Sequence, residues 1–358
     1  MPQPLNRSDC ILVSRIESDV EFQQPRRLID RRVYSGAQGT VCQVIRTVEG
    51  AERELAARKN LHHHLQSVAA SNDGKVLIVV EMELLKAASG MPHMPDFLGA
   101  AQAEADDTVY LFYQPWCEFT LARWLAAPLS TDIDGPSTPS KRKQLGLQWM
   151  VCMAAAIYGL HAAQSPIIHR DLKPTNICIT GTGHLCFVDF GVARLCKDDT
   201  VCSTYVGTEE YMAPEVGRAS HYGRTSEVVS LACIYSEILT VVAGYNVDTG
   251  LRACRRNQPY ARTVKKTLTF LKRCKPEDGS LDEFITLVEE MFALKPLDRP
   301  TLWEVHGRLL DIAGRLNFQL RCCATPLGYE DDKVPDVSTP PSTDELTTEF
   351  LAQCRLQQ

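Results

Sequence analysis

The stretch IIHRDLKPTNICI at residues 167–179 constrains this chain most, because ionisable side chains stand there between two short apolar runs. The isoleucines at either end are typical of buried strands. Burying Arg170, Asp171 and Lys173 without partners would cost roughly several kcal/mol for each charge. The fold must therefore supply partners or a ligand for this segment, which an ordinary turn would not need.

Length and composition set the broad class. The chain has 358 residues, of which 44% are hydrophobic and 23% charged, as is typical of a globular protein with one large domain or two lobes. Its formal net charge of −6 gives no general reason to expect nucleic acid as a partner.

The 14 cysteines lie mainly in apolar contexts such as WMVCMAAAIYGL, where cysteine behaves as a small buried hydrophobe. No Cys/His pairing has zinc-like spacing, and the adjacent pair CC at 322–323 is too close for an ordinary disulfide, so we assign it no role. The first residues lack a signal-sequence pattern, and no uninterrupted apolar run approaches the roughly 18 residues of a membrane span. We expect an intracellular protein, cytoplasmic or nuclear, with no membrane span.

The pattern along the chain predicts an α+β protein with a small strand-rich first lobe and a larger helical second lobe. Residues 1–26 are expected to form a loosely packed N-terminal arm, and the Pro/Ser/Thr-rich residues 324–358 a disordered tail. Strands and a glycine turn follow residue 27, whereas 51–61 suits a third strand or a short helix. Residues 128–143 are expected to be a loop. Helices are predicted at 76–89, 144–163, 225–243, 262–273, 281–293 and 301–315.

The charged segment suits the chemistry of phosphoryl transfer. That reaction needs a carboxylate that accepts the proton of the attacking hydroxyl, a cation for the moving phosphoryl group, and oxygen ligands for Mg²⁺. HRDLKPTN offers Asp171, Lys173 and Asn176, and VDFGVARL then supplies Asp189 as a second carboxylate, which can bind the metal.

These two segments have the order and spacing of the H-R-D-L-x-x-x-N and D-F-G motifs, so the sequence resembles the eukaryotic protein kinase family. The resemblance continues in GTEEYMAPE (207–215) and PLDRP (296–300) and covers roughly residues 27–315. It implies a bilobal protein-kinase-like fold, with an N-lobe at about 27–114 and a C-lobe at about 117–315. Lys173 and the GT..YMAPE form are similar to serine/threonine enzymes rather than tyrosine enzymes.

The resemblance implies a role for each matching residue. Asp171 would orient and deprotonate the substrate hydroxyl, Lys173 would stabilise the transferring phosphoryl group, and Asn176 and Asp189 would hold Mg²⁺. Further residues would be structural, with Arg299 pairing to Glu215; they are His169, Phe190, Glu215 and Arg299.

The first lobe would bind ATP. YSGAQGTV matches the glycine-rich loop at Gly36, Gly39 and Val41, but Tyr34 stands in place of the first glycine. In LAARK, alternation favours Ala57 and Lys59 over a register through Arg58. The helix glutamate that pairs with the lysine would be Glu81, with Glu83 as the alternative, and Trp116 would offer its backbone N–H to the nucleobase.

The segment TSEVVSLACIYSEIL departs from the family pattern at three positions, with Glu227 for aspartate, Val229 for tryptophan and Ala232 for glycine. In the family the aspartate accepts backbone N–H groups from the catalytic loop, so a longer side chain there could lower activity. The region that follows resembles, loosely, kinases common in filamentous fungi.

A phosphorylation switch is expected in the activation loop. Arg170 precedes Asp171, and a phosphate on Thr204, or on its neighbour Ser203, would satisfy the guanidinium and order the loop. Thr208 would contact the catalytic loop instead of being modified. The alternatives are plain solvated hydroxyls, or Asp198 and Asp199 acting as a permanent negative charge.

The resulting function is ATP-dependent phosphorylation of serine or threonine in protein substrates, with an upstream kinase or autophosphorylation as activator. A catalytically weak or inactive pseudokinase that binds nucleotide as a scaffold is the alternative, since Tyr34 and Glu227 depart from the pattern. A small-molecule kinase fits less well with the GTEEYMAPE segment. The histidines of LHHHL (61–65) are expected to be a solvated run and not a metal site.

Overall fold

The computed structural model describes residues 10–12, 21–23, 34–36, 39–48, 51–60, 73–103, 109–127, 131–132, 135–136, 138–196, 206–219, 223–325 and 327. The chain divides into two compact units. Unit 1 comprises Met1–Leu121 and Thr175–Gly191, and unit 2 comprises Ala122–Pro174 and Val192–Gln358.

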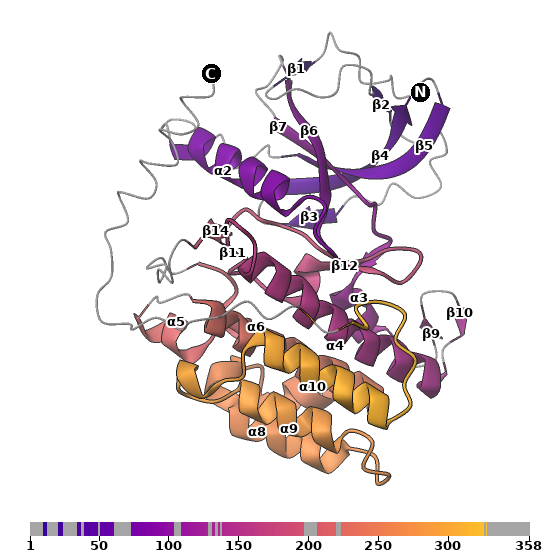
Figure 1. The fold of residues 1–358 in the computed structure, drawn as a ribbon, viewed down its shortest axis with the longest axis vertical. Coiled ribbons are helices and arrows are strands. Elements are labelled where there is room, and N and C mark those ends of the chain that lie inside the picture. The colour runs from indigo at the N-terminus through magenta and orange to yellow at the C-terminus, as the bar shows by residue number, and fades with distance from the viewer. Residues whose placement is uncertain are drawn as a thin grey trace. The chain divides into compact units, whose positions relative to one another are not determined.

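Unit 1 contains a seven-stranded antiparallel sheet with the order β1-β6-β7-β5-β4-β2, in which β3 also pairs with β4 (Figure 1). Its strands are β1 Cys10–Leu12, β2 Glu21–Gln23, β3 Tyr34–Gly36, β4 Gly39–Val48, β5 Ala51–Asn60, β6 Asp96–Ala103 and β7 Val109–Gln114. The alanine-rich segment 51–60, which also suited a helix, is a strand. Its backbone pairs with β4 on one side and β7 on the other, and this pairing outweighs local helix propensity.

The N-terminal segment differs from the loosely packed arm expected from the sequence. Two parts of it that the structure describes are strands of the sheet: β1 pairs with β6, and β2 pairs with β4. Three-residue strands give almost no periodicity in a sequence, so the pattern of residues 1–26 did not reveal them.

The described residues of unit 1 also include a helix and a small sheet. Helix α2, Asp73–Ala88, packs against β6 and buries Met82, Leu84 and Leu85 (Figure 1). The small sheet has the order β13-β12-β8, formed by β8 Phe119–Thr120, β12 Ile177–Ile179 and β13 Leu185–Phe187. Its strands β12 and β13 form a hairpin with a turn at residues 180–184, and at the open end of the hairpin the Val188 N–H donates to the Asn176 carbonyl.

Unit 2 is mainly helical. Its longer helices are α4 Pro139–His161, α6 Arg224–Val242, α8 Tyr260–Cys274, α9 Asp282–Met291 and α10 Leu302–Arg315. The shorter elements of unit 2 are α5 Pro214–Ala219, α7 Ala253–Arg255, a π-helical turn at Val247–Arg252, and 3₁₀ turns at Glu209–Tyr211 and Pro296–Asp298. Along the chain, α3 Leu121–Ala126 and the 3₁₀ turn Pro174–Asn176 cross the boundary between the units. Two-residue strands pair as β9 Thr131–Asp132 with β10 Gly135–Pro136, and as β11 Ile167–Ile168 with β14 Arg194–Leu195.

The core of unit 2 lies along α4 and α6, which pack against each other, while α10 packs on α4 and α9 on α6 (Figure 1). Trp149 of α4 stacks edge-on against Trp124 at 4.9 Å, and the Tyr235 hydroxyl of α6 donates to the Met150 carbonyl. Among the described residues, α6 is long and apolar enough to cross a membrane, but 89% of that window is buried inside the protein. Its apolar character therefore belongs to the core.

The loop expected at 128–143 ends earlier than predicted. Helix α4 begins at Pro139, and the hydroxyl of its N-cap Thr138 accepts from the backbone N–H of Lys141. A threonine followed by proline at the first helical position is a helix-start signal, which the Pro/Ser-rich composition obscured.

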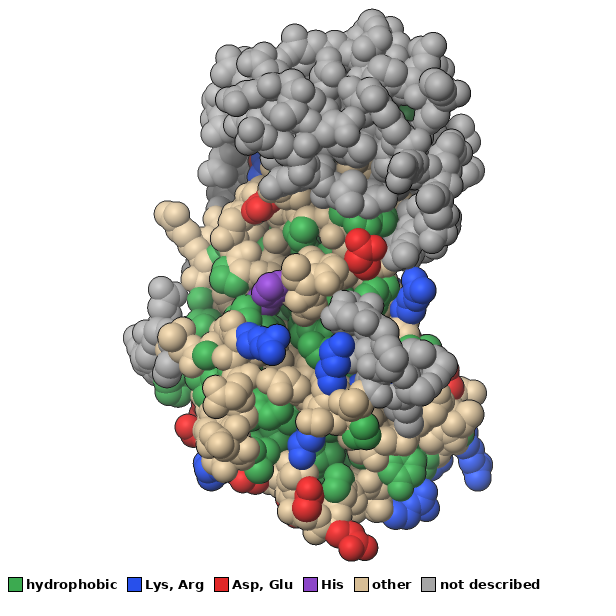
Figure 2. Space-filling model, turned by 90° about the vertical axis from the view of Figure 1, so that its right-hand side faces the viewer, with side chains coloured by type: hydrophobic (Ala, Val, Ile, Leu, Met, Phe, Trp, Pro, Cys, Tyr) green, Lys and Arg blue, Asp and Glu red, His purple; other side chains and the backbone are tan. Residues whose placement is uncertain are grey.

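On the face drawn in Figure 2, charged side chains of both signs lie singly or in small groups among apolar ones. No extended field of one sign covers the described residues of that face.

Candidate active site

The predicted catalytic loop begins at the end of β11 and is anchored to α6. The Arg170 backbone N–H donates to Glu227 Oε1 at 2.8 Å, and Glu227 Oε2 lies 2.7 Å from His161 Nε2. Glu227 is 1% exposed, so it forms a buried bridge between α4, α6 and the loop. The glutamate thus makes the contact to the loop backbone that the sequence comparison assigned to a shorter aspartate.

Asp171 is surrounded by two polar side chains of unit 2. Lys173 Nζ lies 2.6 Å from Asp171 Oδ2, and the Thr208 hydroxyl donates to Asp171 Oδ1 at 2.8 Å. Lys173 Nζ also donates to Thr208 Oγ1 at 2.8 Å, which closes a triangle of polar contacts. Asp171 is 8% exposed and Lys173 24%, so the carboxylate is held by partners while the ammonium reaches solvent. The structure thus brings together three of the residues singled out in the sequence.

Arg170 is buried, with 3% exposure, and its backbone has a φ of +65°. Its Nε donates to the Val192 carbonyl at 2.7 Å. This hydrogen bond gives the buried guanidinium a partner within unit 2.

Asn176 and Asp189 lie close together within unit 1. The hydrogen bond from the Val188 N–H to the Asn176 carbonyl, at 2.9 Å, holds the residue before Asp189 against Asn176. Asp189 has a φ of +70°, a backbone conformation that costs energy for a residue other than glycine and is common at functional sites. An amide oxygen and a carboxylate are suitable ligands for Mg²⁺, so this pair fits the metal that the sequence predicted.

An apolar surface in unit 1 is formed by Tyr113 and Trp116, with Val41 and Val188 packed against them. Tyr113 is 7% and Trp116 6% exposed. Burial raises the pKa of Tyr113 well above its usual value, and the nearby carboxylates of Glu81 and Asp189 raise it further. The side chain therefore stays neutral, as a flat apolar wall requires.

The glycine-rich segment forms the turn between β3 and β4, where Gly36 pairs with Gly39 and Tyr34 with Val41. The register of β5 places Lys59 opposite Val41, and Ala57 opposite both Gln43 of β4 and Tyr113 of β7.

The two glutamates that competed for the lysine have different surroundings on α2. Glu81 is 5% exposed, whereas Glu83 is about one-third exposed and forms an ion pair with Lys86 at 2.6 Å. Burial therefore favours Glu81 as the acid that points into unit 1.

Glu215 and Arg299 form a bidentate ion pair, with N–O distances of 2.6 Å and 2.9 Å. The Ser226 hydroxyl also donates to Glu215. Burial by itself would raise the pKa of Glu215, but the hydrogen bonds and positive charge of Arg299 lower it overall. The pairing implied by the family resemblance is present in the structure.

A second buried network was missed in the sequence. Glu237 is fully buried on α6, and its Oε1 accepts hydrogen bonds from Tyr211, Arg252 and Tyr260 at 3.1–3.2 Å. Its Oε2 accepts none from the residues that the structure describes. Burial, as the largest cause, raises the pKa of Glu237, although Arg252 opposes the change.

This network holds the segment EEYM (209–212) against α6. The Tyr211 carbonyl accepts from Ser230 of α6, and Glu210 pairs with the buried Arg255 at 2.6 Å. These residues have no short spacing that would connect them. The signal available was a glutamate inside an otherwise apolar helix, which needs partners when buried.

The remaining predicted residues are distributed as follows. His169 and Phe190 are buried at 0% and 1% exposure, and Val229 and Ala232 belong to the buried part of α6. Thr204, Ser203 and the histidines 62–64 lie outside the described residues.

Comparisons with known proteins agree with this geometry. The chain is 37% identical over 117 residues to the serine/threonine-protein kinase PknD of Mycobacterium tuberculosis, which is 32% of this chain and 17% of that protein. It is 34% identical over 129 residues to a RAC family serine/threonine-protein kinase homolog of Dictyostelium discoideum, which is 34% of this chain and 27% of that protein. The chain therefore spans less than a third of the length of these curated relatives. The protein kinase domain family matches residues 34–308, which is more than half of the chain, and the chain belongs to this family.

Proposed function

We propose that this chain is an ATP-dependent serine/threonine protein kinase. The observation that carries the proposal is Asp171, which is held by Lys173 Nζ on one carboxylate oxygen and by the Thr208 hydroxyl on the other. The Thr208 contact shows that an aliphatic hydroxyl can donate to this carboxylate at hydrogen-bond distance, as the hydroxyl of a substrate serine or threonine would have to do.

In the proposed reaction, the substrate oxygen forms a bond to the γ-phosphorus while the bond between that phosphorus and the β–γ bridging oxygen breaks. The hydroxyl proton passes to Asp171, and ADP leaves with the bridging oxygen. Lys173 donates hydrogen bonds to the phosphoryl oxygens as they move. Glu227 keeps Asp171 in position through the backbone of Arg170.

Mg²⁺ would be held by Asn176 and Asp189 and would neutralise phosphate charge when bound. The adenine would lie on the apolar surface of Val41, Tyr113, Trp116 and Val188. The phosphates would contact the backbone at Gly36 and Gly39 and the side chain of Lys59, with Glu81 as its partner and Ala57 beside the base. The β5 register supports Lys59 over Arg58, because Lys59 is opposite Val41 of the apolar surface.

Three aspects of the regulation and cellular context complete the proposal. Thr204 is the site of activating phosphorylation, by an upstream kinase or by autophosphorylation. The substrates are proteins, bound along the segment 207–215. The protein acts inside the cell.

The test is transfer of radiolabelled phosphate from ATP to a protein substrate, with Mg²⁺ present, followed by identification of the labelled amino acid. Asp171→Asn should abolish transfer, and the exposed Asp311→Asn on α10 should leave it intact. Label on serine or threonine in the wild type supports the proposal. If neither the wild type nor Asp171→Asn transfers phosphate while both bind ATP, the protein is a nucleotide-binding scaffold instead.

A second variant tests the nucleotide site. Lys59→Met should reduce transfer by orders of magnitude while the protein stays folded. Arg58→Met is the matched control. If Arg58→Met is the inactive one of the two, the assignment of β5 is wrong by one residue.

A further inference from the structure

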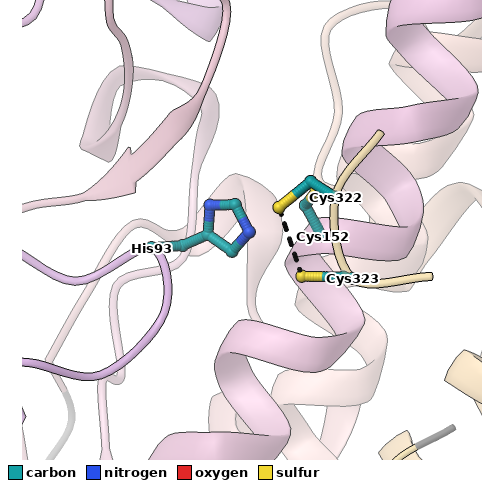
Figure 3. Close-up of side chains that lie close together, drawn as sticks. All are labelled: His93, Cys152, Cys322 and Cys323. Atoms are coloured by element: carbon teal, nitrogen blue, oxygen red, sulfur yellow. Dashed lines mark hydrogen bonds between the residues drawn. The ribbon is translucent and has the colours of Figure 1, made fainter. Parts of the chain in front are cut away.

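Three cysteines that are distant in sequence come together in unit 2. Cys152 lies in the middle of α4, and Cys322 and Cys323 belong to the segment that follows α10 and runs beside α4 (Figure 3). The sulfurs of Cys322 and Cys323 are 3.7 Å apart, and all three sulfurs lie within 4.8 Å of one another. Cys152 is 2% exposed, while the other two are partly exposed, so one side of the cluster is open to small solutes.

This spacing suits a common metal ion. Two thiolates bound to one tetrahedral zinc ion, with zinc–sulfur bonds of about 2.3 Å, lie roughly 3.8 Å apart. The Cys322–Cys323 separation is close to that value, and rotation about the side-chain bond of Cys152 can shorten the remaining distances. A disulfide would need sulfurs at about 2.05 Å, and the two neighbours in the chain are poorly placed for one.

The segment that carries the two cysteines is held to α4 by glutamines one turn apart. The Gln144 amide donates to the Gln319 carbonyl at 3.0 Å. Gln148 donates to the Cys322 carbonyl at 2.8 Å and accepts from the Arg321 N–H at 2.7 Å. The cluster is therefore an ordered contact between two elements.

Gln148 also contacts the cluster itself, because its amide N–H donates to Cys152 Sγ at 3.3 Å. A hydrogen bond to a sulfur ligand orients it and stabilises its thiolate form, as residues outside the ligand shell do in metal sites. Cys323 is further fixed through its carbonyl, which lies 3.1 Å from His306 Nε2.

We propose that Cys152, Cys322 and Cys323 form a binding site for a thiophilic divalent cation of the zinc type, which fastens the segment after α10 onto α4. The site contributes three sulfur ligands and leaves the fourth tetrahedral position to water or another small ligand. This site is separate from the residues to which we assign kinase chemistry.

The experiment uses the full chain, reduced and freed of metal, and titrates it with Cd²⁺ while recording the ultraviolet sulfur-to-cadmium charge-transfer band. Zn²⁺ is then added as the competitor. We expect a single saturable cadmium site that Zn²⁺ displaces, and its loss in the variant with Cys152, Cys322 and Cys323 all changed to serine. Cys254→Ser, a partly exposed thiol of α7, is the matched control and should keep the site.

A subtler variant separates a built site from adventitious thiol binding. Gln148→Leu should weaken cadmium affinity roughly 10–100-fold, as loss of a residue that supports a ligand does. Gln144→Leu removes a comparable tie to the same segment without touching a sulfur and should leave the affinity unchanged. Equal cadmium binding by wild type and the triple serine variant would overturn the proposal, as would a wild type that binds no Cd²⁺. So would identical affinities of the two glutamine variants.

Discussion

Two glutamates of unit 2, the partly exposed Glu215 and the buried Glu237, contact arginines, yet their pKa values shift in opposite directions. Glu215 has a lowered pKa, because Arg299 binds both of its oxygens and outweighs the cost of burial. Glu237 has a raised pKa, because it is fully buried and Arg252 contacts only one of its oxygens, at 3.2 Å. Geometry, and not merely the presence of an arginine, decides whether a buried carboxylate is stabilised as an anion.

The difference matches what each glutamate holds. Glu215 follows the A-P sequence and connects α5 to Arg299, which follows the 3₁₀ turn before α10. Glu237 supports Tyr211 in the segment to which we assign peptide binding, and it gathers three donors on one oxygen. Glu237 thus supports Tyr211 with one of its two oxygens, whereas both oxygens of Glu215 are bound by Arg299.

The largest effect that this comparison predicts is for Arg299→Ala. The variant leaves Glu215 without its partner, and removing one member of a buried pair is strongly destabilising. We expect a loss of about 3 kcal/mol in the free energy of unfolding by urea, at the low end for buried pairs because Glu215 keeps some exposure.

The stability lost in Arg299→Ala should depend on pH, because it depends on the charge of Glu215. A lowered pKa in the folded state contributes stability above the ordinary glutamate pKa of about 4.5 and loses it as pH falls through the folded value. The stability gap between wild type and Arg299→Ala should therefore narrow below about pH 4.5. A gap that is constant with pH would show that the pair does not depend on the charge of Glu215.

Glu227→Ala extends the comparison to a third carboxylate of the same unit, which is held by a backbone N–H and a histidine. The change removes the acceptor for the Arg170 N–H, so Asp171 loses its positioning. A displacement of about 1 Å costs roughly a hundredfold in rate, and we expect that loss in kcat for phosphoryl transfer. Glu227→Asp retains the charge, and its kcat should lie between those of the wild type and Glu227→Ala. Full activity of the alanine variant would show that α6 does not position the loop.

Glu237→Gln tests the raised pKa. The folded state holds the proton of Glu237 to higher pH than the unfolded state, so wild-type stability falls as pH rises from about 4.5 through the folded pKa. Glutamine cannot ionise, and its carbonyl can still accept from the two tyrosines. The stability of the variant relative to wild type should therefore increase with pH over that window, measured by urea unfolding at several pH values. A relative stability that decreases with pH would mean that Arg252 dominates after all.

The smallest effect is expected for Arg308→Ala, which breaks an exposed pair with Glu290. Both side chains are more than a third exposed, and such pairs contribute about 0.2–1 kcal/mol. Unfolding by urea beside Arg299→Ala gives the contrast between a surface pair and a buried one. If Arg308→Ala lost as much unfolding free energy as Arg299→Ala, burial would not explain the difference between the two ion pairs.

The parts of the fold that were predicted from the sequence have a strong local signal. The apolar periodicity predicted α6, α8, α9 and α10 to within about two residues, because each buries one face or all of them. The contact of Thr208 with the loop of Asp171 and Lys173 was predicted from the resemblance of their motifs to those of protein kinases, and the structure has this contact. The start of α4 was missed where composition masked the cap formed by Thr138 and Pro139.

Contacts between distant segments had no comparable signal. Glu237 meets Tyr211 and Tyr260 only after α6, α8 and the turn at 209–211 have packed, and none of these spacings is characteristic. Cys152 and the pair at 322–323 appeared unrelated for the same reason, and the adjacent cysteines were assigned no role. Their proximity depends on the segment after α10 returning to α4, which only the three-dimensional structure shows.

The apolar character of α6 has a consequence for how heat inactivates this protein. A helix as apolar as a membrane-spanning segment does not aggregate while the surrounding helices bury it. Heating that unfolds unit 2 exposes this apolar helix to water. We expect the unfolded molecules to aggregate faster than they refold. We therefore expect heat inactivation to be irreversible and to depend on protein concentration, so that survival time at a given temperature, more than a melting point, describes the durability of this protein.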